Sequence, residues 1–223
     1  MLFPNDHEMV SGFLVLPEKA YRQWAIILLH EWWGLNDWVR EQARKLGANG
    51  YIVLAVDLYQ GKVTSKSSEA RKLKRGLQKN RAIRDMKAAF NYLAGCPGVD
   101  PKRIGSIGWS MGGGLALQLA VHEPRLAACV VNYGMPPQTP AEIRRINARV
   151  LGNFGALDRG VPVVKVLAFE KAMKALKKSV DIKVYRHAGH AFANPDNTRG
   201  YRPQAADDAW SRILAFLGPN NRT

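Results

Sequence analysis

The chain of 223 residues contains little cysteine and no long apolar run. Its two cysteines, Cys96 and Cys129, lack the spacing of metal ligands, and Cys129 lies in the stretch LAACVV, which is typical of a buried residue. No apolar run approaches the ~20 residues that a membrane-spanning helix requires. The first ten residues also lack the basic and apolar regions of a secretory signal. We therefore expect a cytoplasmic protein with neither a disulfide framework nor a bound metal.

Acidic residues are scarce as well, with 18 Asp and Glu against 33 Lys and Arg, a formal net charge of +15. Ten of the basic residues lie between Lys62 and Lys87, and a second cluster occupies residues 171–178. Nucleic-acid bases stack on aromatic side chains, but no aromatic residue follows within the first cluster before Phe90. We expect solvated helix faces with a mild attraction for anionic substrates. Nucleic-acid binding through this basic surface is kept as a distant alternative.

The order of apolar and amphipathic segments predicts an α/β fold. With 47% apolar and 23% charged residues, the chain has the composition of an ordinary globular domain, and its length favours one domain over residues 1–223. Strands are predicted at residues 12–17, 24–30, 51–59, 103–109, 126–134, 148–155 and 181–187. Helices are predicted at residues 36–50, 82–95, from about 110, at 161–179 and at about 203–217. Strands that are apolar on both faces and alternate with helices indicate a mostly parallel sheet covered on both sides.

In such sheets, functional sites form beyond the carboxyl ends of the strands. The residues at those positions are the pair His30 and Glu31, Asp57, Ser110, Asp158 and His190. A carboxylate at the end of an apolar strand is costly to bury without a partner. Glu31, followed by two tryptophans and a turn at Gly34, is therefore either solvent-exposed or part of a site.

The sequence GWSMG at residues 108–112 has the pattern of a nucleophile elbow. A predicted strand precedes Ser110 and a predicted helix follows it, as a tight strand-to-helix turn requires. The glycines at positions 108 and 112 allow neighbouring elements to approach the turn closely. We predict that Ser110 is a nucleophile.

A nucleophilic serine needs a general base within hydrogen-bond reach. Three histidines follow Ser110 in the chain. His122 lies about three helical turns beyond the elbow, which is too far, and His187 ends a predicted strand, where we expect a structural role. His190 lies in a short loop after that strand, so it is the predicted base.

The base in turn needs an orienting acid, which in this chain order lies between the serine and the histidine. Asp158 follows the predicted strand 148–155 and precedes a helix, whereas Asp181 precedes its strand and would lie at the opposite edge of the sheet. The predicted triad is Ser110, Asp158 and His190, although Asp158 could also be an ordinary helix cap.

Acyl transfer also requires two N–H groups directed at the developing oxyanion. One should be the backbone N–H of Met111, which follows the nucleophile, and the other should come from a loop after an earlier strand. The backbone N–H of Trp32 is the candidate for the second. Glu31 would then lie within a few ångströms of Ser110.

Five motifs, HEWWGLN, DLY, GWSMGGG, LD followed by VP, and AGHAF, occur in an order and spacing that resemble the dienelactone hydrolase family. The resemblance extends from about Gly12 to Leu217. It implies an eight-stranded α/β-hydrolase fold without a large cap domain. It also implies hydrolysis of lactones or small carboxylic esters without a cofactor, and a glutamate at the position of Glu31 that contacts the resting nucleophile.

The chain departs from this family pattern at two positions. The enzymes that open dienelactone carry a cysteine nucleophile where this chain has Ser110, and an arginine that grips the substrate carboxylate where it has Asn194. A serine must lose its proton to His190 during attack, so Glu31 is expected either to tune His190 or to hold the loop that bears Trp32. A serine esterase is therefore the first reading, and a lactonase acting on an anionic lactone is the alternative.

The predicted substrate pocket is aromatic. Trp32, Trp33, Trp109 and Tyr133 adjoin the strand-end motifs, and we expect them to line the acyl or alcohol pocket together with Asn194. Core packing is the alternative for Trp33 and Tyr133. Aromatic walls with few polar groups suit short or aromatic esters, so the predicted partner is a small-molecule ester or lactone.

Overall fold

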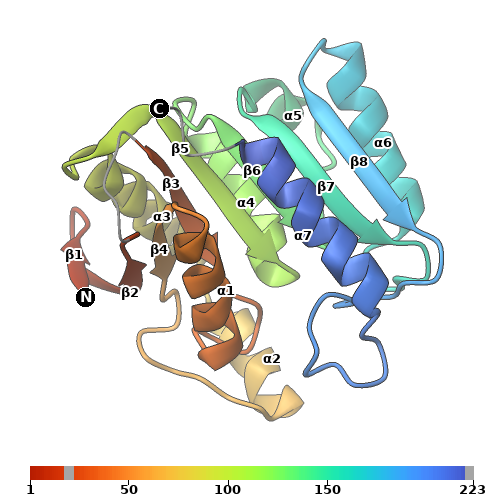
Figure 1. The fold of residues 1–223 in the computed structure, drawn as a ribbon, viewed down its shortest axis with the longest axis horizontal. Helices are drawn as coiled ribbons and strands as arrows, with labels where there is room; N and C mark the ends of the chain where they lie inside the picture. Colours follow the sequence, from red (N-terminus) through yellow and green to blue (C-terminus); the bar gives the residue numbers. More distant parts are fainter. Residues whose placement is uncertain (18–22, 219–223) are drawn as a thin grey trace.

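A computed structural model describes residues 1–17 and 23–218 of the chain as an eight-stranded sheet with helices on both faces (Figure 1). The strands are β1 (Leu2–Pro4), β2 (Met9–Val15), β3 (Gln23–Leu29), β4 (Ile52–Val56), β5 (Val99–Trp109), β6 (Ala128–Asn132), β7 (Arg149–Gly155) and β8 (Val180–Tyr185). The helices are α1 (Asp37–Ala48), α2 (Ser67–Gly76), α3 (Lys79–Ala94), α4 (Met111–His122), α5 (Pro140–Arg145), α6 (Val163–Ala175) and α7 (Pro203–Leu217).

The sheet order is β1-β2-β4-β3-β5-β6-β7-β8. Strands β1 and β2 form an antiparallel hairpin, and β2 is also antiparallel to β4, whereas every pair from β4 to β8 is parallel. The prediction of a mostly parallel α/β sheet is confirmed. Because β3 to β8 run in one direction, the loops that follow them meet at one edge of the sheet, towards which β5 and β8 point in Figure 1.

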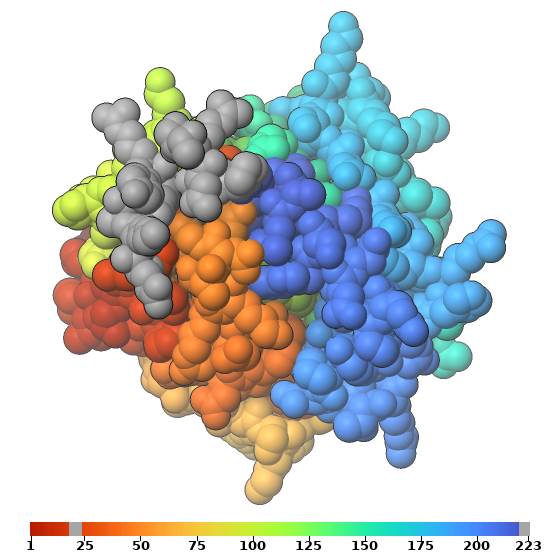
Figure 2. Space-filling model, in the orientation of Figure 1, coloured from red at the N-terminus to blue at the C-terminus, as the bar shows by residue number. Residues whose placement is uncertain are grey.

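Two apolar layers cover the two faces of the sheet. Along β3, the side chains alternate between them, with Ile27 and Leu29 on one face and Ile26 and Leu28 on the other. Helices α3, α4, α5 and α6 cover the first face, and α1 and α7 cover the second, which is the face seen in Figures 1 and 2. Both faces of the central strands are therefore buried, as their continuous apolar sequences predicted.

The structure contains two short elements that the sequence analysis did not predict, β1 and α5, and a helix, α2, whose bounds it did not give within the basic segment of helical character. Strand β1 has three residues and includes Pro4, and it forms by pairing with β2, which begins at Met9 rather than at Gly12. Helix α5 has only six residues. Helix α2 buries Ala70 alone, so its apolar periodicity is weak, and the prediction of a solvated basic face holds for this helix. In the described part of the chain, no helix is long and apolar enough to cross a membrane.

Candidate active site

Ser110 lies between the end of β5 and the start of α4, with φ of 52° and ψ of −116°. A positive φ is costly for a residue with a side chain, and such strain is typical of functional positions. The turn is also crowded. A Cβ at Gly112 would collide with the backbone of Leu29 and His30, and a Cβ at Gly108 would collide with Gly112. The glycines therefore let α4 begin directly against the end of β3.

A continuous chain of hydrogen bonds joins Ser110, His190 and Asp158. The Oγ atom of Ser110 lies 2.7 Å from Nε2 of His190, and Nδ1 of His190 lies 2.7 Å from Oδ2 of Asp158. The other carboxylate oxygen of Asp158 accepts the backbone N–H groups of Gly160 and Val161 at 2.8 and 2.9 Å. Asp158 is buried whereas the side chain of His190 is 40% exposed. The geometry suits a base that is oriented from one side and open to substrate on the other.

The histidines rejected on sequence grounds lie elsewhere. His122 ends α4, where its Nδ1 lies 2.8 Å from the carbonyl oxygen of Gln118. His187 is exposed and contributes its backbone carbonyl to Arg202. Neither therefore takes the position next to Ser110.

The other two strand-associated aspartates are also outside the hydrogen-bonded chain. Asp181 lies at the start of β8 and pairs with Arg212 at 2.7 Å. Asp57 accepts the hydroxyl of Ser11 and the backbone N–H of Tyr59, so it closes the turn after β4. This turn ends β4 at Val56, earlier than the predicted residue 59.

Glu31 is buried near His190. The parallel register between β3 and β5 ends with Leu29 opposite Gly108, two residues before Glu31 and Ser110, and the charge of His190 acts on the carboxyl of Glu31. The Oε2 atom of Glu31 accepts the Nδ2–H of Asn194 at 2.8 Å, and its Oε1 atom has no partner among the described residues. Burial raises the pKa of Glu31 to about 7, and the hydrogen bond from Asn194 and the nearby His190 offset part of this rise. The sequence left Glu31 either exposed to solvent or part of a site, and its burial excludes the first of these possibilities.

Three of the predicted pocket residues are buried rather than exposed to a pocket. Trp109 packs edge-on against Trp38 at 5.4 Å in the core beneath α1. Tyr133 is fully buried, and its ring packs against those of His190 and Phe192. The amide of Asn194 is taken up by Glu31. All three side chains therefore lie in the protein interior rather than on an exposed pocket wall.

Trp32 and Trp33 are partly exposed and pack against each other, with ring centroids 4.8 Å apart. The chain then turns at Gly34, whose φ is +90° and where a Cβ would collide with the backbone of Lys62. Within residues 1–17 and 23–218, the backbone N–H groups of Trp32 and Met111 donate to no acceptor. Neither N–H group is therefore taken up by another part of the described chain.

Sequence reasoning missed a residue that holds the loop of His190. The side-chain amide of Asn197 donates to the carbonyl oxygens of His190 and Ala191 at 3.0 and 3.3 Å. Asparagine commonly bonds to nearby backbone in turns, so the segment NPDN could have indicated this role. The contact joins Asn197 to the backbone of the loop that carries His190.

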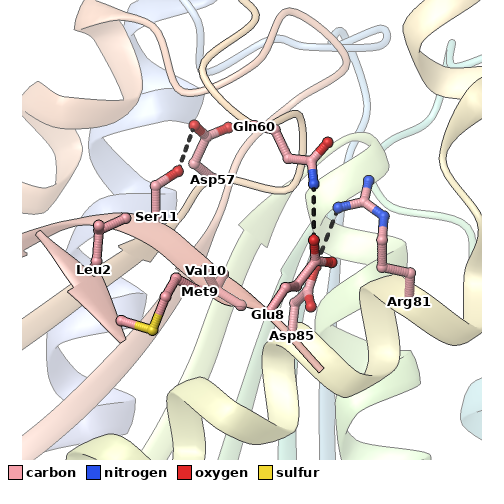
Figure 3. A pocket seen from close by; sticks show the side chains of 9 residues that line it. All are labelled: Leu2, Glu8, Met9, Val10, Ser11, Asp57, Gln60, Arg81 and Asp85. Carbon is pink, nitrogen blue, oxygen red and sulfur yellow. Dashed lines mark hydrogen bonds and ion pairs between the residues drawn. The ribbon is translucent and has the colours of Figure 1, made fainter. Parts of the chain in front are cut away.

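A cavity of about 240 Å³ lies next to the N-terminal hairpin (Figure 3). It is lined by Leu2, Glu8, Met9, Val10, Ser11, Asp57, Gln60, Arg81 and Asp85. Its polar groups bond to one another, and none of these residues belongs to the hydrogen-bonded chain of Ser110. Over the described residues, no group of three or more His, Cys, Asp or Glu side chains is arranged to hold a metal ion.

Comparison with known proteins relates the chain to one family. Residues 10–220 match the profile of the dienelactone hydrolase family. A protein of Saccharolobus solfataricus named "Putative carboxymethylenebutenolidase" is 31% identical, over 97% of this chain and 96% of its own. The crystal structure of a "Putative Dienelactone Hydrolase" from Klebsiella pneumoniae superimposes with a TM-score of 0.88 at 26% identity, covering 97% of this chain and 96% of the other.

Proposed function

The chain belongs to the dienelactone hydrolase family, and from this membership we propose that it is a serine-dependent hydrolase of small carboxylic esters or lactones. The proposal assigns Ser110 as nucleophile, His190 as general base and Asp158 as orienting acid. The observation that carries it is the hydrogen-bonded chain of these three side chains, with a strained serine at one end and a buried carboxylate at the other.

Hydrolysis would proceed through an acyl-enzyme. The Oγ atom of Ser110 attacks the carbonyl carbon of the substrate while its proton moves to Nε2 of His190. The resulting imidazolium is stabilised by Asp158, whose carboxylate accepts the Nδ1–H and thereby fixes the orientation of the ring. His190 then protonates the departing alkoxide, and the ester bond to the alcohol breaks. Water, deprotonated by the same imidazole, attacks the acyl-serine and releases the acid.

The N–H groups of Trp32 and Met111 are the proposed oxyanion donors. They have no other acceptor in the described chain, and the start of α4 abuts the end of β3, which brings their two loops together. Negative charge develops on the carbonyl oxygen during attack, so donors that are already oriented lower the barrier without reorganisation.

Glu31 is proposed to support this site rather than to carry the reacting proton. Nε2 of His190 lies 2.7 Å from the Oγ atom of Ser110, whereas the carboxyl of Glu31 accepts a hydrogen bond from Asn194 and has no bond to Ser110 among the described residues. A buried carboxyl with a pKa of about 7 is also largely neutral in slightly acidic solution. Its proposed role is to hold the turn that bears Trp32.

The surroundings of Glu31 favour an uncharged acyl group. Its direct partner is the neutral amide of Asn194, and His190 and Asp196 act on it electrostatically. Arg81, from the basic segment, is committed to Asp85 and to the carbonyl oxygen of Leu58. A substrate carboxylate placed here would lie beside a second acid, and Arg81 is already paired elsewhere, so burying that carboxylate costs free energy. We therefore favour neutral esters over anionic lactones.

A matched substrate pair tests this proposal. Initial rates would be measured on p-nitrophenyl butyrate and on mono-p-nitrophenyl succinate, together with a panel of neutral and anionic lactones. We expect kcat/KM to be higher for the neutral ester, and Ser110→Ala to abolish both reactions. Faster turnover of the anionic substrates would instead support the lactonase alternative. A chain inactive towards every ester and lactone would contradict the proposed function.

A further inference from the structure

His30 is a fully buried histidine that the proposed triad does not use. It is the first residue after β3, directly before Glu31. Its Nδ1 atom lies 2.6 Å from the backbone carbonyl oxygen of Glu31, and its Nε2 atom lies 3.2 Å from the backbone N–H of Leu58. A carbonyl can only accept and a backbone N–H can only donate. These two contacts therefore require the neutral tautomer with its proton on Nδ1.

Burial supports the same protonation state. The absence of solvent around the ring lowers the pKa of His30, and the carbonyl of Glu31 and the charge of Asp57 offset part of this effect. The neutral ring can satisfy both backbone partners, whereas a protonated ring would direct a second N–H at the N–H of Leu58. The neutral ring thus joins the turn after β3 to the turn after β4.

The contact to Glu31 also orients the next N–H group. The carbonyl of Glu31 and the N–H of Trp32 belong to the same planar trans peptide unit, so they point in opposite directions. The carbonyl is held by Nδ1 of His30 and additionally by the N–H of Gly34 at 3.3 Å. Holding the carbonyl towards His30 therefore keeps the N–H of Trp32 directed away from the ring.

The turn after β4 reaches the second proposed donor. Tyr59, the residue after Leu58, packs edge-on against His30 with ring centroids 4.8 Å apart. The hydroxyl of Tyr59 lies 3.3 Å from Sδ of Met111. A short path of contacts thus runs from the peptide that carries the N–H of Trp32, through His30 and Tyr59, to the residue that carries the other N–H.

We infer that His30 is a positioning residue for the oxyanion hole, which it serves by clamping the peptide between Glu31 and Trp32 against the turn at Leu58. This inference rests on the proposed function. His30 contacts no reacting atom. Loss of its contacts would weaken stabilisation of the oxyanion in the transition state, and would therefore lower kcat more than it raises KM.

Two substitutions separate the halves of the clamp. The amide of Asn extends about as far from the backbone as Nδ1, and the amide of Gln about as far as Nε2. His30→Asn can therefore still donate to Glu31, whereas His30→Gln can still accept from Leu58 but releases the carbonyl of Glu31. The control is His122→Gln, which removes another Nδ1 contact to a backbone carbonyl, on α4 away from the elbow.

The variants would be compared by kcat and KM on p-nitrophenyl butyrate, by thermal unfolding, and by the inhibition constant of an alkylboronic acid, whose tetrahedral serine adduct needs the oxyanion donors. His30→Gln should lose roughly 10–100-fold in kcat with little change in KM, since loss of one complete donor costs roughly 10²–10³-fold. Its boronate affinity should fall in parallel. The kcat of His30→Asn should stay within roughly tenfold of the wild-type value, and the kcat of His122→Gln should equal the wild-type value.

Equal losses in His30→Asn and His30→Gln, or a loss confined to KM, would overturn the inference and leave His30 a core residue. If neither variant folds, the test uses the wild-type protein. The NMR resonance of the Trp32 amide proton should move downfield when the boronate adduct forms. An unchanged resonance would also overturn the inference. Ser110→Ala is measured in parallel to separate this result from a failure of the proposed function. The proposed function would fail if the wild type were inactive or if Ser110→Ala kept full activity.

Discussion

Replacement of Glu31 by Gln should make the protein more stable at high pH. Burial raises the pKa of this carboxyl from 4.5 to about 7 in the folded protein. The folded state therefore holds the proton more tightly than the unfolded chain. That stabilisation is complete below pH 4.5 and is lost as the pH rises through about 7. At about 1.4 kcal/mol per pKa unit, the loss amounts to about 3 kcal/mol by pH 8.5.

Gln at position 31 has no proton to lose, and its amide oxygen can still accept the Nδ2–H of Asn194. The stability of Glu31→Gln relative to the wild type should therefore rise by about 3 kcal/mol between pH 4.5 and pH 8.5. Urea unfolding followed by tryptophan fluorescence at both pH values measures this difference. Glu41→Gln, which removes an exposed carboxylate on α1, controls for the loss of one negative charge.

A relative stability that changes by less than about 1 kcal/mol over this range would refute the buried, largely neutral carboxyl. The same variant tests the role of Glu31 in activity. Glu31→Gln should lose far less kcat than His190→Ala, and Glu31→Ala should lose more than Glu31→Gln because it frees the peptide of Trp32. The upper limit is set by one misplaced oxyanion donor, at ~2.7–4 kcal/mol. A loss in Glu31→Gln equal to that in His190→Ala would make Glu31 an essential proton carrier.

Three further outcomes test the proposed site. A fluorophosphonate should label Ser110 and abolish activity, whereas alkylation of Cys96 should leave activity largely intact. Mass spectrometry that finds another residue labelled and Ser110 unlabelled would contradict the assignment. The Ser110→Ala/His190→Ala double variant should be little worse in kcat than either single variant, because the residues act as a unit, and additive losses would argue against a triad. Asn194→Arg should place a cation beside Glu31 and raise kcat/KM for mono-p-nitrophenyl succinate relative to p-nitrophenyl butyrate; an unchanged ratio of the two rates would show that position 194 does not select for charge.

Much of the site could be predicted because its residues follow strands. Parallel strands bring their carboxyl ends to one edge of the sheet, so Ser110, Asp158 and His190 were predicted to meet although up to 80 positions separate them. Local patterns sufficed: apolar runs for the strands, a glycine-flanked serine for the elbow, and a loop histidine after the strand now seen as β8. Their hydrogen-bonded arrangement agrees with that expectation, while their catalytic roles stay a proposal.

The elements that were missed, or given no bounds, are those whose local signal is weak. Strand β1 and helix α5 are too short for a periodic pattern, and α2 buries only Ala70. Strand β1 forms because β2 supplies its hydrogen-bonding partners, which the sequence of β1 does not indicate. Periodicity reports burial along one segment, so it cannot detect an element that is stabilised chiefly by another.

The amino-acid sequence by itself determined the class of fold, the family and the residues at the strand ends, because these depend on local pattern and chain order. Only the tertiary structure decided how the side chains beyond those ends are used. Asn194 bonds to Glu31 across 163 positions, and His30 bonds to Leu58 across 28. Nothing local indicates either pair, since a side chain's partner depends on which loops the closed sheet brings together. The raised pKa of Glu31 has the same origin, because burial is a property of the whole fold.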